Sequence, residues 1–114
     1  MVKNMEYAEN FILVISSINN QNKAAEIAKE AVKQRLAACC SVTNSFTSFF
    51  VWEDNFEQSN EYYMVFKTEE SKLMDLEIFI KSMHSDIIPE ILSFKIYKGS
   101  ENYLNWMREY IFGG

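Results

Sequence analysis

The sequence predicts an α+β sandwich whose elements follow the order strand, helix, strand, strand, helix, strand, with an extra helix at the C-terminus. Two observations lead to this prediction. Short runs of β-branched and aromatic residues alternate with two longer stretches in which apolar residues recur every three to four positions. The 114 residues include one proline, three glycines and no low-complexity block, so we expect one domain without a linker. We place this domain at residues 11–112, after a loose leader at residues 1–10.

The first half of the chain supplies a strand, a helix and a long second strand. Residues 11–15 form a short aliphatic run that is typical of a buried strand. Residues 22–38 carry alanine and aliphatic side chains at helical spacing, and Asn19 and Asn20 precede them as candidate N-caps. Aromatic and β-branched residues dominate residues 39–52, which indicates a long strand with room for a bulge.

The second half repeats the alternation. A turn at residues 53–55 leads to a third strand at residues 62–67, with Phe56 as its earliest start, so the second and third strands form a long hairpin. A second helix begins near Thr68 or Ser71 and runs to Met83. We expect a fourth strand at residues 91–97 and a last short helix with Ser100 as its candidate N-cap.

This order is that of the split βαβ, or ferredoxin-like, fold. Right-handed crossovers place both main helices on one face of the antiparallel sheet and leave the other face bare in a single chain. The chain also holds nine Phe, six Tyr and two Trp, which is more than one small core needs. We therefore expect other subunits to cover the aromatic residues between positions 46 and 52.

Composition argues against several classes of partner. The formal net charge of −5 and the pI of about 4.9 disfavour nucleic acid and anionic membranes, which select for basic surfaces, and are compatible with a cation. No stretch has the features of a signal peptide or the length of a membrane span. Cys39 and Cys40 are adjacent, and neighbouring cysteines rarely form a disulfide, so we expect free thiols in the cytoplasm.

Residues 84–91 are the first place to look for proton or metal chemistry, because they hold the only histidine, His84, and the only proline. Asp86 and Glu90 add carboxylates to this segment. Cys39 and Cys40 are soft metal ligands, but successive strand side chains point to opposite faces and do not grip one ion without a bulge. The structural alternatives are core packing for the cysteines and a helix-end position for the histidine.

Several residue groups occur in a characteristic order along residues 11–107, and in this collinear set the chain resembles the CutA divalent-cation-tolerance family. The resemblance implies a ferredoxin-like homotrimer linked to tolerance of divalent metals, copper above all, with no established enzymatic reaction. It also implies copper contacts at Cys39 and His84, to which we add Glu90 because a proline fixes the backbone before it. The matching groups are Arg35-Leu36-Ala37-Ala38-Cys39, Thr47 to Glu53, Lys67-Thr68, His84, Pro89-Glu90-Ile91, Gly99 and Tyr103-Leu104-Asn105-Trp106.

The chain departs from the pattern of that family at three places. Ser85-Asp86 stands where Pro-Tyr is usual after the histidine, and Asn44-Ser45 stands where a Pro-Gly step is frequent. Ser16 occupies a position where some members have cysteine, which weakens a metal site that needs that thiol.

We therefore predict a non-enzymatic homotrimer that binds copper or another divalent cation through Cys39, His84 and Glu90, with no other cofactor. A first alternative is a small-molecule sensor akin to the PII regulators, although the short turn at residues 53–55 differs from their long loop. A second is a hydrolase or redox enzyme with Cys39 as nucleophile and His84 as base. A third is a rigid scaffold for a partner protein.

Overall fold

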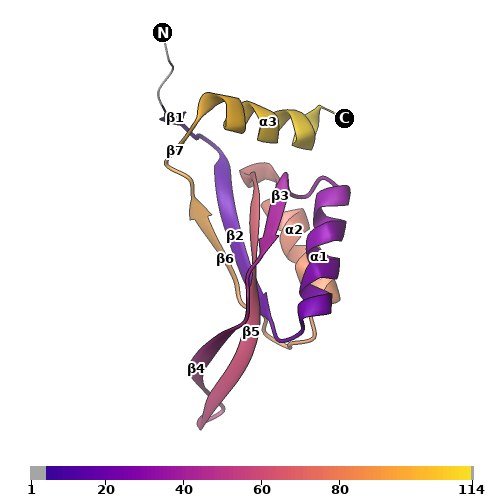
Figure 1. Ribbon diagram of the computed structural model, residues 1–114, viewed down its shortest axis with the longest axis vertical. Coiled ribbons are helices and arrows are strands. Elements are labelled where there is room, and N and C mark those ends of the chain that lie inside the picture. Colours follow the sequence, from indigo (N-terminus) through magenta and orange to yellow (C-terminus); the bar gives the residue numbers. More distant parts are fainter. Residues whose placement is uncertain (1–4, 114) are drawn as a thin grey trace.

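The computed structural model describes residues 5–113 and confirms the α+β ferredoxin-like fold (Figure 1). Its elements are β1 (Glu6–Tyr7), β2 (Phe11–Ile18), α1 (Gln21–Lys33), β3 (Cys39–Val42), β4 (Phe46–Trp52), β5 (Asn55–Glu69), the 3₁₀ helix η1 (Glu70–Lys72), α2 (Leu73–Met83), β6 (Ile91–Lys95), β7 (Lys98–Gly99) and α3 (Glu101–Phe112).

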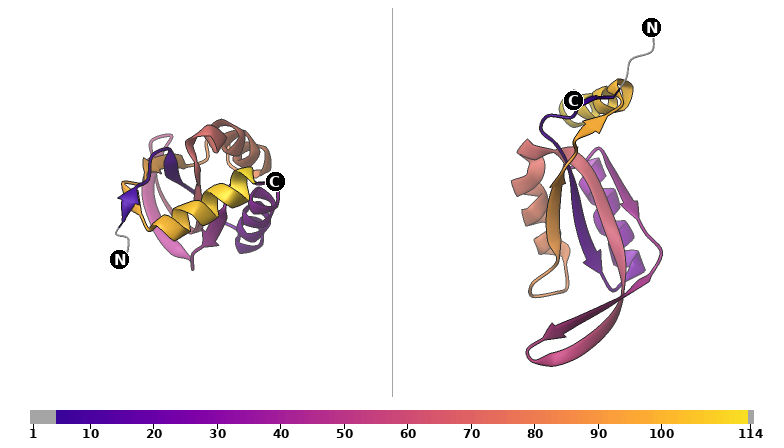
Figure 2. Two further views of the ribbon diagram at one scale, coloured as in Figure 1. Left: turned by 90° about the horizontal axis from the view of Figure 1, so that it is seen from above. Right: turned by 90° about the vertical axis from the view of Figure 1, so that its left-hand side faces the viewer.

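The main sheet is antiparallel, with the strand order β3-β5-β2-β6 and with β4 paired to the first half of β5. The predicted hairpin is confirmed, and it is long enough to project beyond the helices at one end of the molecule (Figures 1 and 2). Its turn consists of Glu53 and Asp54, whose φ angles are 50° and 66°. Two successive left-handed residues are what a type I′ turn requires, so the turn twists with the strands that it joins.

The main core lies between the sheet and the two helices α1 and α2, which cover the same face as predicted (Figure 1). Val14 and Phe66 of the sheet are fully buried there, together with Ile27 of α1. Because strand side chains alternate between faces, the intervening residues point to the other face of the sheet. That open face includes Leu92 and Phe94 of β6, which are 50% and 51% exposed.

A smaller core lies where α3 crosses the end of the sheet opposite the hairpin (Figure 2). Phe11 and Leu104 are buried in it. The Arg35 guanidinium donates a hydrogen bond to the Tyr110 carbonyl, and the Tyr110 hydroxyl donates one to the Val32 carbonyl. These two hydrogen bonds hold the C-terminal half of α3 against the end of α1.

Helix α1 ends at Lys33, so the prediction that it continues to residue 38 was wrong. Arg35 has φ 60°, and the N–H groups of Arg35 and Leu36 donate to the carbonyls of Val32 and Ala31. This is the hydrogen-bond pattern of a Schellman cap, which stops a helix by a left-handed residue at C′. The predicted N-cap is confirmed at Asn20, whose side chain accepts from the Lys23 N–H at 3.0 Å.

Strand boundaries also differ from the prediction. The stretch predicted as one strand is divided into β3 and β4 by residues 43–45, and Thr43 is fixed to β5 by two hydrogen bonds to the Tyr63 backbone. The fourth strand, β6, ends at Lys95 rather than at residue 97. Residues Glu6–Tyr7 belong to a strand that pairs with β7, where a loose leader was predicted, and residues 1–4 of that leader lie outside the described residues.

The molecule measures 56 × 27 × 23 Å, and its radius of gyration is 15.5 Å. A compact chain of this length has a radius of gyration of about 13 Å. The projecting hairpin accounts for the excess, and its apolar side chains Phe49, Val51 and Phe56 are all exposed. Within residues 5–113, no helix is long and apolar enough to span a bilayer.

Candidate functional site

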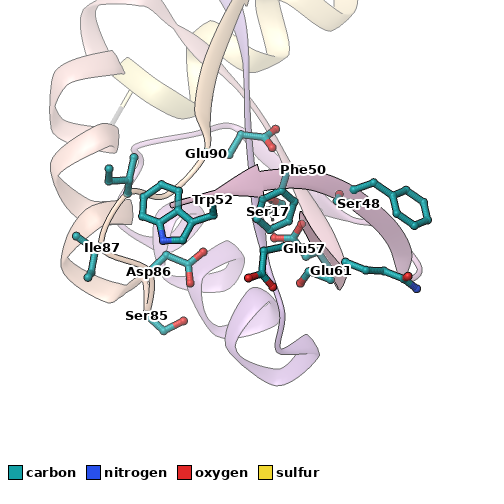
Figure 3. A pocket seen from close by; sticks show the side chains of 14 residues that line it. Ser17, Ser48, Phe50, Trp52, Glu57, Glu61, Ser85, Asp86, Ile87 and Glu90 are labelled. Atoms are coloured by element: carbon teal, nitrogen blue, oxygen red, sulfur yellow. Dashed lines mark hydrogen bonds between the residues drawn. The ribbon is translucent and has the colours of Figure 1, made fainter. Parts of the chain in front are cut away.

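A cavity of about 780 Å³ lies between the β4–β5 hairpin and residues 84–90, which join α2 to β6 and are called the connector below (Figure 3). Its volume is within the usual range for small-ligand sites. Among the described residues that line it there is no Lys or Arg, and four carry carboxylates. We call it the acidic cavity. Its lining residues are Ser17, Ser48, Phe49, Phe50, Trp52, Glu57, Gln58, Ser59, Glu61, Ser85, Asp86, Ile87, Ile88 and Glu90.

Two of these carboxylates interact near the end of β2. The Ser17 hydroxyl donates to Oε1 of Glu61 at 3.3 Å. Partial burial and, after it, the negative charge of Glu61 raise the pKa of Glu90, while hydrogen bonds from Ser17 and Tyr63 oppose the rise. Burial and the charges of Glu90 and Glu61 likewise raise the pKa of Tyr63. Because the negative charge of Glu61 contributes to the raised pKa of Glu90, a cation bound beside them would favour the charged form of Glu90.

No Lys or Arg side chain among the described lining residues offsets this charge. The ion pairs that Lys side chains make with Glu26, Glu30 and Glu77 all lie on the outer surfaces of α1 and α2. The acidic cavity therefore carries a negative charge that no Lys or Arg in its described lining offsets, and such a charge attracts cations.

Aromatic side chains form the hairpin wall of the cavity. Trp52 is 44% exposed, and Figure 3 shows its ring beside the connector that carries Asp86 and Ile87. Phe49 and Phe50 line the same wall and are also exposed. An aromatic face beside carboxylates attracts cations electrostatically and also accepts apolar groups.

His84 follows the last residue of α2, and its side chain has no exposed surface. Its Nε2 lies 2.6 Å from the Ser17 carbonyl oxygen, and the Asp86 backbone N–H donates to its Nδ1 at 2.9 Å. A carbonyl oxygen only accepts and a backbone N–H only donates, so the imidazole proton is on Nε2 and the Nδ1 lone pair is occupied. In this conformation neither ring nitrogen is available to a metal ion.

The predicted cysteine ligand lies apart from the other two. Cys39 begins the edge strand β3, while Glu90 precedes the opposite edge strand β6. Three strand spacings separate these edges, or about 14 Å. Across residues 5–113, no group of three or more His, Cys, Asp or Glu side chains is arranged to hold a metal ion. One chain therefore does not bring Cys39, His84 and Glu90 to a single ion.

The cysteines also have different surroundings. Cys40 packs against the main core, and burial raises the pKa of its thiol to about 12, so it is not a thiolate at neutral pH. Cys39 lies across from Lys67 of β5. Both ring nitrogens of His84 are hydrogen-bonded to the backbone of Ser17 and Asp86. The hydrogen bond between Cys39 and His84 that a cysteine nucleophile with a histidine base would need therefore does not form.

Sequence reasoning identified Glu90 and Asp86 but missed Ser17, Glu61 and Tyr63. Ser17 and Tyr63 are cross-strand neighbours in the β2–β5 pair, and Glu61 lies two residues before Tyr63 in β5. The available signal was the pair of serines at the end of an otherwise aliphatic strand. Without the register of the β2–β5 pair, that signal does not indicate which residue faces Ser17.

Comparison with proteins of known family gives a consistent result. The family described as CutA1 divalent ion tolerance protein matches residues 12–110. Protein CutA of Homo sapiens is 33% identical over 90 residues, which are 79% of this chain and 50% of that protein. The chain thus spans about half the length of this relative. The divalent-cation tolerance protein CutA of Thermus thermophilus is 31% identical over 97 residues, which are 85% of this chain and 94% of that protein.

Solved structures agree with this match. The structure of CutA from Synechococcus elongatus superposes with a TM-score of 0.90 at 26% identity and covers 96% of each chain. A structure of the same protein complexed with a Bis-Tris molecule gives a TM-score of 0.87 at 26% identity, over 94% of this chain and 99% of that one.

Proposed function

This chain belongs to the CutA1 divalent ion tolerance protein family, and from this premise we propose that it binds a divalent cation in the acidic cavity without catalysing a reaction. The observation that carries the proposal is the group of four carboxylates with no Lys or Arg in the described lining. Glu61 and Glu90 are the proposed first contacts, since the negative charge of Glu61 raises the pKa of Glu90 and a cation bound between them would offset that charge. For a given set of oxygen and nitrogen ligands, Cu(II) binds most tightly among first-row divalent ions, so copper is the proposed preferred metal.

We further propose that the working form is a homotrimer in which neighbouring subunits complete the cation site. The half-exposed apolar residues of the open sheet face, Leu92 and Phe94, and the exposed hairpin residues Phe49 and Phe56 support an assembly of copies of this chain. In such an assembly, Cys39 reaches a cation at Glu90 only from a neighbouring subunit. Within one chain about 14 Å separates their edge strands, and the strand register sets the two residues about four positions apart along the sheet as well. The cytoplasm is its proposed location, since two free thiols persist best in a reducing compartment.

Calorimetric titration of the purified protein with Cu(II) and Zn(II) tests the proposed cation site. Light scattering on the same sample gives the oligomeric state. We expect Glu61→Gln and Glu90→Gln each to weaken Cu(II) binding by about tenfold or more, since each removes a charged ligand without changing side-chain size. Glu26→Gln is the matched control, because that carboxylate pairs with Lys23 on the outside of α1 and its loss should leave the titration unchanged. Equal affinities for the wild type and both cavity variants would reject the acidic cavity as the cation site.

A second candidate function is small-molecule sensing in the same cavity. Its volume and its aromatic wall suit a small organic ligand, and the Synechococcus relative has been solved in complex with Bis-Tris. The turn between β4 and β5 has only two residues, Glu53 and Asp54, and so differs from the long loop of the PII regulators. Thermal-shift measurements with organic amines, organic anions and nucleotides test this function. Saturable stabilisation that Trp52→Ala abolishes would support it, and no stabilisation by any of these compounds would reject it.

A further inference from the structure

The acidic cavity has one wall made by a segment without regular secondary structure. The connector supplies five of the 14 lining residues, including the carboxylates of Asp86 and Glu90. Ile87 and Ile88 beside them are exposed and belong to neither core. The position of the two carboxylates therefore depends on whatever fixes the connector to the sheet.

His84 provides that connection. Its Nε2 is hydrogen-bonded to the Ser17 carbonyl at 2.6 Å, which joins the start of the connector to the end of β2. Its Nδ1 accepts the Asp86 N–H at 2.9 Å, which folds the connector back on itself. Ser17 in turn donates its hydroxyl to Glu61. Three segments that meet at the cavity, namely the connector, β2 and β5, are thus linked through one imidazole and one serine.

We propose that His84 is a positioning residue of the acidic cavity and not one of its ligands. As a neutral imidazole with its proton on Nε2, it sets where Asp86 and Glu90 stand relative to Glu61. This inference rests on the proposed cation site for its functional meaning, whereas the role of His84 in fixing the connector stands on the hydrogen bonds alone.

The two hydrogen bonds of the imidazole can be removed separately. Glutamine places an amide N–H near the position of Nε2, and asparagine places an acceptor near the position of Nδ1. His84→Gln therefore keeps the donor to Ser17 and loses the acceptor for Asp86, and His84→Asn does the reverse. His84→Leu loses both and keeps an apolar side chain in the buried space. Circular dichroism and light scattering establish that each variant has the fold and assembly of the wild type.

Two NMR measurements on the metal-free protein test the positioning role. Because His84 is the only histidine, long-range ¹H–¹⁵N correlations give its tautomer without ambiguity, and we expect the neutral Nε2–H form. The Asp86 amide should exchange with solvent about tenfold faster in His84→Gln and His84→Leu, which lose its acceptor, and at nearly the wild-type rate in His84→Asn. An Nδ1–H tautomer, or equal exchange in all four proteins, would overturn the inference.

Titration with Zn(II), which is diamagnetic, then separates a positioning residue from a ligand. We expect the His84 ring nitrogens to keep their chemical shifts at saturation, and His84→Leu to bind about tenfold more weakly than the wild type while the two amide variants fall between them. Direct ligation would move one ring nitrogen resonance strongly and would overturn the proposal, as would wild-type affinity in His84→Leu. If no protein binds Zn(II) or Cu(II), the cation function fails, and the tautomer and exchange data still decide whether His84 fixes the connector.

Discussion

The contact between Arg35 and Tyr110 gives a stability prediction that separates two opposing effects at one residue. The guanidinium donates to the Tyr110 carbonyl and lies 4.4 Å from the centre of the Tyr110 ring. A hydrogen bond from a charged donor contributes about 1.5–3 kcal/mol, and a cation–π contact about 0.5–1 kcal/mol. Against this, a φ of 60° costs a residue with a Cβ about 1 kcal/mol, which glycine avoids. Arg35→Ala keeps a Cβ and should lose about 2–4 kcal/mol, and Arg35→Gly about 1 kcal/mol less than that.

Urea denaturation measures both changes, and one fixed protein concentration keeps the contribution of the proposed trimer the same for every variant. Arg108→Ala is the control, because Arg108 also lies over an aromatic ring, that of Phe11 at 5.1 Å, but its hydrogen bond stays within α3. Its loss should cost less than 1 kcal/mol or so. The reasoning is refuted if Arg35→Gly is less stable than Arg35→Ala, because the left-handed position would then carry no strain. Wild-type stability in Arg35→Ala would show that the contact with Tyr110 contributes nothing.

Further predictions follow from three other side chains. Cys40 should react with iodoacetamide far more slowly than Cys39 at pH 8. A thiol of pKa about 12 is ionised in only about one molecule in ten thousand at that pH. Equal alkylation rates of the two cysteines, measured by mass spectrometry, would contradict this prediction. Folding raises the pKa of the Glu90 carboxyl above its ordinary value of 4.5, so this group contributes stability below pH 4.5. That contribution is lost as the pH rises through the pKa that Glu90 has in the folded protein. When the free energy of unfolding is measured from pH 4 to 7, Glu90→Gln should lack this decrease in stability. Thr68→Val should lower the free energy of unfolding by about 1–2 kcal/mol. The buried Thr68 hydroxyl donates to the Leu36 carbonyl at 2.8 Å, and valine leaves that carbonyl without this donor. An unchanged midpoint of urea denaturation would show that the hydrogen bond has no net effect.

The elements and their order were predictable because hydrophobic periodicity reports how each segment is buried. The end of α1 was not predictable, because Ala37 and Ala38 extend the helical pattern of apolar residues. Both follow the end of the helix, and Ala37 is buried in the main core and Ala38 in the smaller one. Arginine is an uncommon residue at a left-handed C′ position, so the local sequence gave no stop signal there. Residues Glu6–Tyr7 form a strand because they pair with β7, about 90 positions away in the sequence. A segment of two residues is too short to show an alternating pattern, so this strand could not be predicted.

The candidate site was predictable only where its residues lie close in sequence. His84, Asp86 and Glu90 share the connector, so a scan along the chain found them together. Ser17 and Glu61 reach the same place through strand register, which depends on pairing over more than 40 positions. The role of the histidine was beyond sequence reasoning for a different reason. The same histidine can act as a metal ligand or as a positioning residue. The two roles differ in whether a ring nitrogen has a free lone pair for the metal, and the sequence does not show this.

The departure from the family pattern after His84 acquires a physical meaning in this geometry. Asp86 stands where the resemblance implies a tyrosine, and its backbone N–H keeps the imidazole in place whatever side chain the residue carries. The side chain is therefore free to vary without loss of the connector. In this chain it adds a carboxylate to a cavity that already holds Glu57, Glu61 and Glu90. At 52% exposure that carboxylate remains hydrated and costs little to keep charged. Aspartate at position 86 thus adds to the negative charge of the cavity, while the hydrogen bonds of His84 and Ser17 stay the same.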